Sequence, residues 1–176
     1  VLTNVNRENV DEIEPLAELL RGINVPHVYD FVRGTGFSAW DIPQSIQTEE
    51  DPRDCGLPPI EDLEGLVDRI ERIDQEEGGQ FGQWIEQLRW QVELYRGAWL
   101  PVPCLSAGRT AGVIYSDGSV TACEFTKPFA HLKDYDYDLV RLWSGPEAKT
   151  RRSQITRCRC THSCFLLTSH QEWLEQ

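Results

Sequence analysis

The sequence lacks any apolar run approaching the roughly 18 residues that a membrane-spanning helix needs, so no membrane span is expected. Its opening, VLTNVNRENVDEIEP, has neither the basic start nor the apolar stretch of a secretory signal. The chain also contains no methionine. We therefore expect a cytoplasmic protein, and a chain that is either processed or a fragment of a longer one.

Basic side chains are scarce: 17 Lys and Arg stand against 29 Asp and Glu, a net charge of -12. A surface of that sign repels phosphate backbones and anionic lipids, so we expect no nucleic-acid and no membrane partner. The one basic cluster, KTRRSQITRCR, lies beside the last cysteines. It is either a solvated helix face or a local positive field that lowers thiol pKa values.

Cysteine is nearly absent from the first part of the chain, since five of the six cysteines lie at or after Cys104. An even number keeps disulfides open, but disulfide scaffolds are short, secreted and cysteine-dense throughout. The late clustering instead favours a metal site. Cys55, alone in PRDCGLPP, is expected to be a loop thiol without a role because its basic neighbour is balanced by two acids.

Residues 1–34 predict a strand, a helix and a second strand. VLTNV is apolar, NVDEIEPLAELLRG repeats apolar residues at helical spacing, and VPHVYDFVRG alternates like a strand. Strand–helix–strand at this spacing is a βαβ unit, which implies a parallel pair. One such unit cannot cover both faces of a sheet, so the segment resembles a part of something larger.

Two further helices are predicted over 60–77 and 80–96, after an irregular segment at 35–58 that is rich in turn formers and acids. The break between the helices is the pair Gly78-Gly79.

The sequence pattern changes after residue 103, from helical spacing to a strand-and-turn pattern. GVIYSDGSVTAC predicts a β-hairpin, with its turn at Ser116-Asp117-Gly118. Two short helices follow, the second opened by a capping box from Ser144 to Glu147. The predicted fold class is α/β, and more narrowly α+β, because a βα segment is followed by a small hairpin with helices.

The last cysteines are close together in CRCTHSC, from Cys158 through Cys160 to Cys164. A single zinc ion needs sulfurs within about 4 Å of one another and typically uses C-x-x-C, which the chain lacks. A cubane iron–sulfur cluster holds its thiolates on four separate irons and tolerates wider spacing. Hairpin pairing should bring Cys104 and Cys123 together, and the late segment would supply the rest.

These residues resemble a known family. Cys104-x13-Gly118-x4-Cys123 matches the opening half of the SPASM/twitch motif, C-x(9–15)-G-x(4)-C, of the auxiliary-cluster domains of radical SAM enzymes. The following HLKDYDYDLVRLW and RRSQITRCRCTHSC resemble the short helix and late cysteines of that domain. The N-terminal segment is similar to the last βα units of the radical SAM partial barrel.

The resemblance implies three segments: 1–37 as the end of the partial barrel, 38–98 as an irregular loop and two-helix linker, and 99–176 as the auxiliary-cluster domain. It implies one auxiliary [4Fe–4S] cluster held by four of the five late cysteines: Cys104, Cys123, Cys158, Cys160 and Cys164. His162 competes with a thiol for one position or is a hydrogen-bonding loop residue.

Arg33 and Gly34 end a strand of the barrel type, so the resemblance places them on the substrate or SAM side, with a surface turn as the alternative. The full SPASM set of later cysteines is absent, which favours the single-cluster twitch arrangement.

No C-x3-C-x2-C occurs, so the residues that would bind the SAM-cleaving cluster are missing, and the chain alone is not expected to cleave SAM. The expected function is the C-terminal part of a radical SAM oxidoreductase or maturase. Its cluster would relay electrons or anchor a peptide or small-molecule substrate beside the rest of the barrel. The alternatives are a structural zinc module without catalysis and a domain whose cysteines bind no metal.

Overall fold

The computed structural model describes residues 1–33, 39–48, 56–98, 104–155, 158–163, 165, 166, 168 and 169. The chain divides into two compact units, each made from two separate stretches: Val1–Phe37 with Pro52–Trp99, and Ser38–Asp51 with Leu100–Gln176. The helices expected to form a linker thus belong with the N-terminal segment. The boundaries differ from those expected because patterns along a sequence do not report which apolar faces meet.

The first unit begins with the predicted βαβ arrangement. β1 (Leu2–Val5) and β2 (Val28–Phe31) pair in parallel, and α1 (Ile13–Gly22) connects them. A short 3-10 turn, η1 (Val10–Glu12), leads into α1. Pro15 lies in the first turn of α1, where an absent N–H breaks no helical hydrogen bond. The parallel pairing is confirmed.

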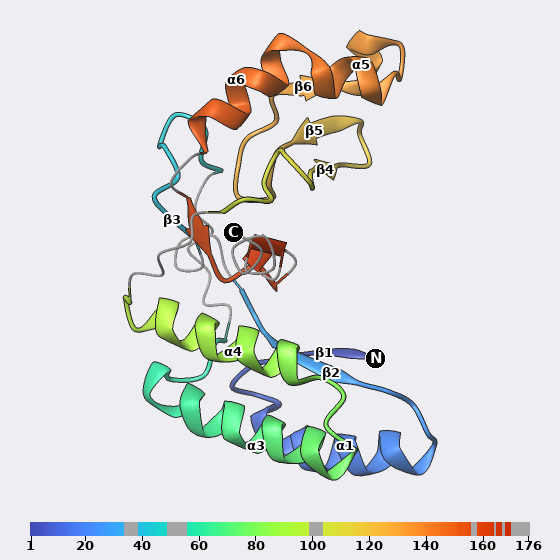
Figure 1. Ribbon diagram of the computed structural model, residues 1–176, viewed down its shortest axis with the longest axis vertical. Coiled ribbons are helices and arrows are strands. Elements are labelled where there is room, and N and C mark those ends of the chain that lie inside the picture. Colours follow the sequence, from blue (N-terminus) through green and yellow to red (C-terminus); the bar gives the residue numbers. More distant parts are fainter. Residues whose placement is uncertain are drawn as a thin grey trace. The chain divides into compact units, whose positions relative to one another are not determined.

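The two predicted helices are also confirmed, as α3 (Leu63–Glu76), preceded by η2 (Ile60–Asp62), and α4 (Gly82–Tyr95). In the first unit α3 lies against α1 and α4, and α4 contacts β2 (Figure 1). Their apolar stripes bury the unit's core against the strands. Its most buried members are Val5, Ile13, Phe31, Leu63, Val67 and Leu88.

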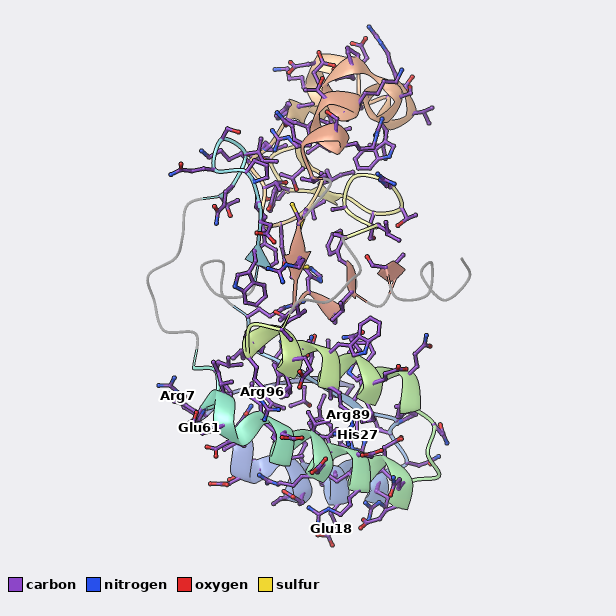
Figure 2. All side chains as sticks on the ribbon, turned by 60° about the vertical axis from the view of Figure 1, so that its left-hand side comes forward. Arg7, Glu18, His27, Glu61, Arg89 and Arg96 are labelled. Atoms are coloured by element: carbon purple, nitrogen blue, oxygen red, sulfur yellow. The ribbon has the colours of Figure 1, made fainter. Side chains whose placement is uncertain are left out.

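Ion pairs cover the outer faces of these helices. Arg89 Nη2 lies 3.0 Å from an Asp68 oxygen, and Arg96 Nη2 lies 2.8 Å from a Glu64 oxygen. Arg89 belongs to α4 and Arg96 directly follows it, and Figure 2 labels both. Partly exposed pairs of this kind contribute at most about 1 kcal/mol each, so the apolar core carries most of the unit's stability.

The second unit contains the predicted hairpin. β4 (Val113–Ile114), β5 (Ser119–Thr121) and β6 (Ala130–His131) form an antiparallel sheet in that order. The Tyr115 N–H donates to the Ser119 carbonyl at 2.9 Å, and Gly118 has φ +91° at the turn. A left-handed residue there is what a three-residue hairpin loop requires, so the hairpin is confirmed.

Beyond the sheet lie η3 (Leu132–Tyr135), α5 (Leu139–Ser144) and α6 (Pro146–Gln154). The two short helices were predicted, but the capping box was wrong. Gly145 is the N-cap of α6, and the Ser144 hydroxyl donates to the Val140 carbonyl at 2.6 Å instead. Pro146 favours the first helical position, which moves the cap to Gly145 and leaves Ser144 in the last turn of α5.

The second unit also contains a small two-stranded ladder. β3 (Ala39–Trp40) pairs antiparallel with β7 (Arg159–Cys160), so that Ala39 faces Cys160. Among the described residues, none of the helices has both the length and the apolarity to cross a bilayer.

Candidate metal centre

All four cysteines that the structure describes after residue 103 belong to one apolar cluster of the second unit. Cys123 and Cys158 are buried members, while Cys104 and Cys160 are partly buried and pack against the cluster. Its other buried members come from five segments: Ala39, Ile46, Ala107, Ala122, Phe125, Ile155 and Phe165. The fold thus gathers thiols from positions more than 50 residues apart.

Backbone hydrogen bonds hold the cysteine segments against one another. The Cys104 N–H donates to the Cys158 carbonyl at 2.9 Å, and the Gly108 N–H donates to the Ala122 carbonyl at 3.1 Å. The first bond fixes the late segment beside Cys104, and the second fixes the strand that leads to Cys123. The expectation that the hairpin and the late segment converge therefore has a direct structural counterpart.

Cys104 also receives a hydrogen bond at its sulfur, because the Ala107 N–H points to Sγ at 3.3 Å. Hydrogen bonds to sulfur are one way that proteins tune iron–sulfur clusters. The Ala107 amide thus fixes the position of the Cys104 sulfur.

Burial dominates the electrostatics of Cys123 and Cys158. Desolvation raises the pKa of Cys123 to about 12, helped by the nearby Cys104, Glu124 and Cys158 and opposed by the Phe125 backbone amide. Desolvation likewise raises the pKa of Cys158 to about 12, with Cys104 and Asp41 adding to the shift. Without a cation, both thiols are neutral; a bound metal centre would replace their protons.

Asp41 is a neighbour that sequence reasoning missed. Its carbonyl lies 3.7 Å from the Cys158 sulfur, and its carboxylate accepts a hydrogen bond from Arg159 Nε at 2.9 Å. Asp41 has φ +59°, so its backbone is held in the left-handed region. No pattern signals this contact, because it joins an irregular segment to residues more than 115 positions later.

His162 is buried beside the cluster. Its Nε2 lies 3.1 Å from a Glu124 carboxylate oxygen, and its ring makes edge contacts with Phe125 and Phe165. In the described part of the chain its Nδ1 is buried without a hydrogen-bond partner. One ring nitrogen of His162 thus faces a carboxylate, and the choice between a ligand and a hydrogen-bonding loop residue stays a prediction.

The described thiols do not form a ready-made site for a single ion. In the ranges that the structure describes, no three His, Cys, Asp or Glu side chains are placed to hold one metal ion. A four-iron cluster spreads its thiolates over separate irons. The thiol donors, their apolar surroundings and the amide at Cys104 fit such a cluster in chemical type.

Three of the predicted or discussed residues, Gly34, Cys55 and Cys164, lie outside the described residues. Arg33 is partly buried and follows the end of β2 by two positions, at the carboxyl end of the parallel pair. Its predicted proximity to substrate or SAM stays a prediction.

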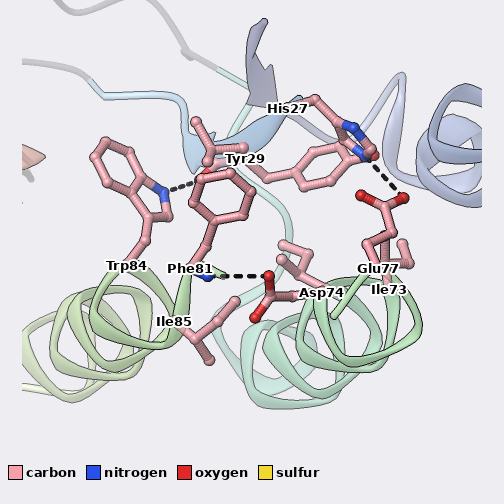
Figure 3. A pocket seen from close by; sticks show the side chains of 10 residues that line it. His27, Tyr29, Ile73, Asp74, Glu77, Phe81, Trp84 and Ile85 are labelled. Atoms are coloured by element: carbon pink, nitrogen blue, oxygen red, sulfur yellow. Dashed lines mark hydrogen bonds and ion pairs between the residues drawn. The ribbon is translucent and has the colours of Figure 1, made fainter. Parts of the chain in front are cut away.

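The first unit has a crevice of its own, lined by β2, α3, α4 and the turn between the two helices (Figure 3). Trp84 Nε1 donates to the Tyr29 carbonyl, the Phe81 N–H donates to Asp74 at 3.1 Å, and His27 Nε2 lies 3.7 Å from Glu77. The enclosed volume is about 10 Å³, the size of one water molecule. The crevice is therefore a gap between packed side chains that is too small to hold a ligand.

No protein-family model, curated protein or solved structure matches this chain.

Proposed function

We propose that this chain is the C-terminal part of a radical SAM enzyme whose second unit binds an auxiliary [4Fe–4S] cluster of the twitch type. The observation that carries the proposal is the hydrogen bond between Cys104 and Cys158, with Cys123 in the same apolar cluster. Two cysteines of the matched motif and one of the late group thus converge, as a cluster site requires.

Cys104, Cys123 and Cys158 would be three ligands, and Cys160 or Cys164 the fourth. Cys160 lies in β7 and packs against the same cluster. The bound cluster would supply electron relay or substrate anchoring. The chain's own residues would exclude water through Ile46, Phe125 and Phe165 and donate to the Cys104 sulfur from the Ala107 amide.

The first unit supports the same proposal through its fold. A parallel βαβ unit ending in Arg33 is what the last part of a βα barrel requires. SAM and the SAM-cleaving cluster would be bound only in the full-length enzyme, in the cytoplasm, and the substrate class would be a peptide or small molecule.

Anaerobic reconstitution with iron and sulfide tests the proposal. We expect about four irons and four sulfides per chain and a brown protein. Cys104→Ser and Cys123→Ser should lose most of the iron, whereas Cys55→Ser should retain it. Comparing Cys158→Ser, Cys160→Ser and Cys164→Ser identifies the remaining ligands.

Stoichiometric zinc without sulfide would instead support the structural zinc module. A protein that retains neither metal after reconstitution would leave the cysteines as ordinary core residues and would refute the cluster.

A further inference from the structure

The second unit carries an apolar groove along the outer edge of β4. It encloses about 460 Å³, within the range of pockets that bind ligands. Its walls are the strand residues Val113 and Ile114 on one side and Leu139, Val140 and Trp143 of α5 on the other. The groove is therefore a surface feature of the hairpin and α5, and none of the four described cysteines lines it.

Apolar side chains in this groove are unusually open to solvent. Val140 is 79% exposed, Ile114 48% and Leu139 42%. Single exposed apolar residues are ordinary, but a contiguous group around a concave surface is typical of an interaction site.

In the part of the chain that the structure describes, β4 is an end strand of its sheet, so one of its edges carries backbone groups that no neighbouring strand pairs. The hydrogen bond from Tyr115 N–H to the Ser119 carbonyl makes that pair a hydrogen-bonded one. Pairs alternate along an antiparallel ladder, so the N–H and C=O groups of Ile114 and Gly112 face away from β5. An extended chain could hydrogen-bond to them as an added strand.

A cationic side chain, Arg109, lies before the start of β4 at one end of the groove. Arg109 lines the groove and is exposed, and within the described part of the chain its side chain forms no ion pair or hydrogen bond. Its neighbours differ: Arg152 donates to the Gly108 and Trp143 carbonyls, and Arg141 lies 3.6 Å from Asp136. Among the described residues that line the groove none is acidic, although the chain carries a net charge of -12. Charge complementarity therefore calls for a carboxylate at the Arg109 end.

We propose that this groove binds an extended apolar peptide segment that adds a strand to β4 and places a carboxylate at Arg109. Alternate side chains of the segment would enter the wall formed by Val140 and Ile114, and its backbone would pair with the free edge. This inference goes beyond the cluster proposal and does not depend on it.

Fluorescein-labelled peptides of alternating Val and Thr test the proposal against the full 176-residue chain by fluorescence polarisation. One peptide carries Glu at its first position, which suits a parallel added strand, and one carries Glu at its last position, which suits an antiparallel one. We expect saturable binding of one of the two and weaker binding of its Gln counterpart. A version with Pro at the central position should not bind, because Pro removes a ladder donor.

Substitutions in the groove give the matched comparison. Arg109→Gln should weaken binding of the Glu peptide about 3-fold and leave the Gln peptide unchanged, while Lys149→Gln on α6 changes neither. Val140→Ser should weaken binding about 10-fold, whereas Leu19→Ser, at a 62% exposed position of α1, should not. Both target residues are exposed, so these variants keep their fold.

Three results would overturn the proposal: no saturable binding of any peptide, equal binding of the Pro peptide, or equal binding by Val140→Ser. A concentration-dependent dimer that Val140→Ser abolishes, without peptide binding, would assign the edge to a second copy of the chain instead. The peptides are added to protein whose iron content has been measured, and none of the groove residues is a proposed cluster ligand, so failure of the cluster assay is distinguished from failure of this one.

Discussion

Gly112 lies directly against the indole of Trp143: a Cβ at position 112 would stand 2.4 Å from Cη2 and 2.9 Å from Cζ3. The indole cannot easily move, because Arg152 lies over its ring at 5.9 Å and Phe129 packs at 6.2 Å. Gly112→Ala should therefore destabilise the hairpin by about 1–3 kcal/mol, as overpacking does elsewhere. Hydrogen exchange of the β4 and β5 amides measures the loss.

The control for this substitution is Gly65→Ala in α3, where an added Cβ meets nothing within 4 Å. That variant should stabilise its helix by about 0.5–1 kcal/mol. Unchanged protection of β4 and β5 in Gly112→Ala would show that the indole adapts and would contradict the prediction.

Gly118→Ala should cost more than Gly78→Ala, although both positions have positive φ, +91° and +101°. At Gly78 a Cβ meets open space, so only backbone strain of about 1–2 kcal/mol is expected. At Gly118 it would come 2.8 Å from His131 Cε1, and that ring is fixed by contacts to the Asp117 carbonyl and the Lys133 N–H. Thermal unfolding of the two variants gives the comparison, and equal losses would refute the steric contribution.

Asp30 and Gln91 share a buried hydrogen bond, so the effects of substituting them on the free energy of unfolding should be coupled. Asp30 Oδ1 accepts hydrogen bonds from its neighbour's backbone N–H and from Gln91 Nε2, both at 2.9 Å. Gln91→Leu leaves the carboxyl with one donor fewer and should cost about 2 kcal/mol in free energy of unfolding. Gln83→Leu, at an exposed site of the same helix, should cost little.

In an Asp30→Ala background the cost of Gln91→Leu should shrink by at least about 1 kcal/mol, because the acceptor is gone. Urea unfolding of the four proteins completes the cycle. Strict additivity would show that the two side chains do not stabilise one another.

The cluster should hold the second unit together. Cys104→Ala or Cys123→Ala should lower hydrogen-exchange protection across 113–123, because metal binding free energy becomes folding free energy in a small domain. Protection of α3 and α4 should stay, since those helices form the core of the other unit. Cys55→Ala is the control. Full protection of 113–123 in the Cys104 variant would mean that the thiols are not structural.

These 176 residues alone should not convert SAM to 5'-deoxyadenosine under reducing conditions, because no C-x3-C-x2-C segment is present. The measurement is chromatography of the reconstituted protein with SAM and dithionite. Turnover at rates typical of a complete enzyme would contradict the prediction, and its persistence in Cys104→Ser would show a route that does not use the proposed auxiliary cluster.

Local patterns predicted much of the fold. The parallel pair β1–β2, the helices α3 and α4, and the hairpin turning at Gly118 all follow from periodicity and turn residues. The β3–β7 ladder does not, because each strand has only two residues and the paired residues lie 119 or more positions apart. Short distant pairings leave no period in the sequence.

The candidate metal centre could also be predicted only in part from the sequence. Convergence of Cys104 and Cys123 could be predicted from hairpin pairing, since both flank the strands. The bond from Cys104 to the Cys158 carbonyl, and the contact of Asp41 with the Cys158 sulfur, depend on tertiary packing. The spacing of residues in the sequence predicts neither of these two contacts.

The pairing of Ala39 with Cys160 has a consequence for synthesis. The first unit supplies the residues between the two stretches of the second. On a ribosome, residues 52–99 emerge and can fold while β3 waits for a partner strand that is translated about 120 residues later. The second unit therefore cannot form its β3–β7 ladder until Cys160 has been translated, and assembly of any metal centre on Cys104, Cys123 and Cys158 has to follow synthesis of Cys158.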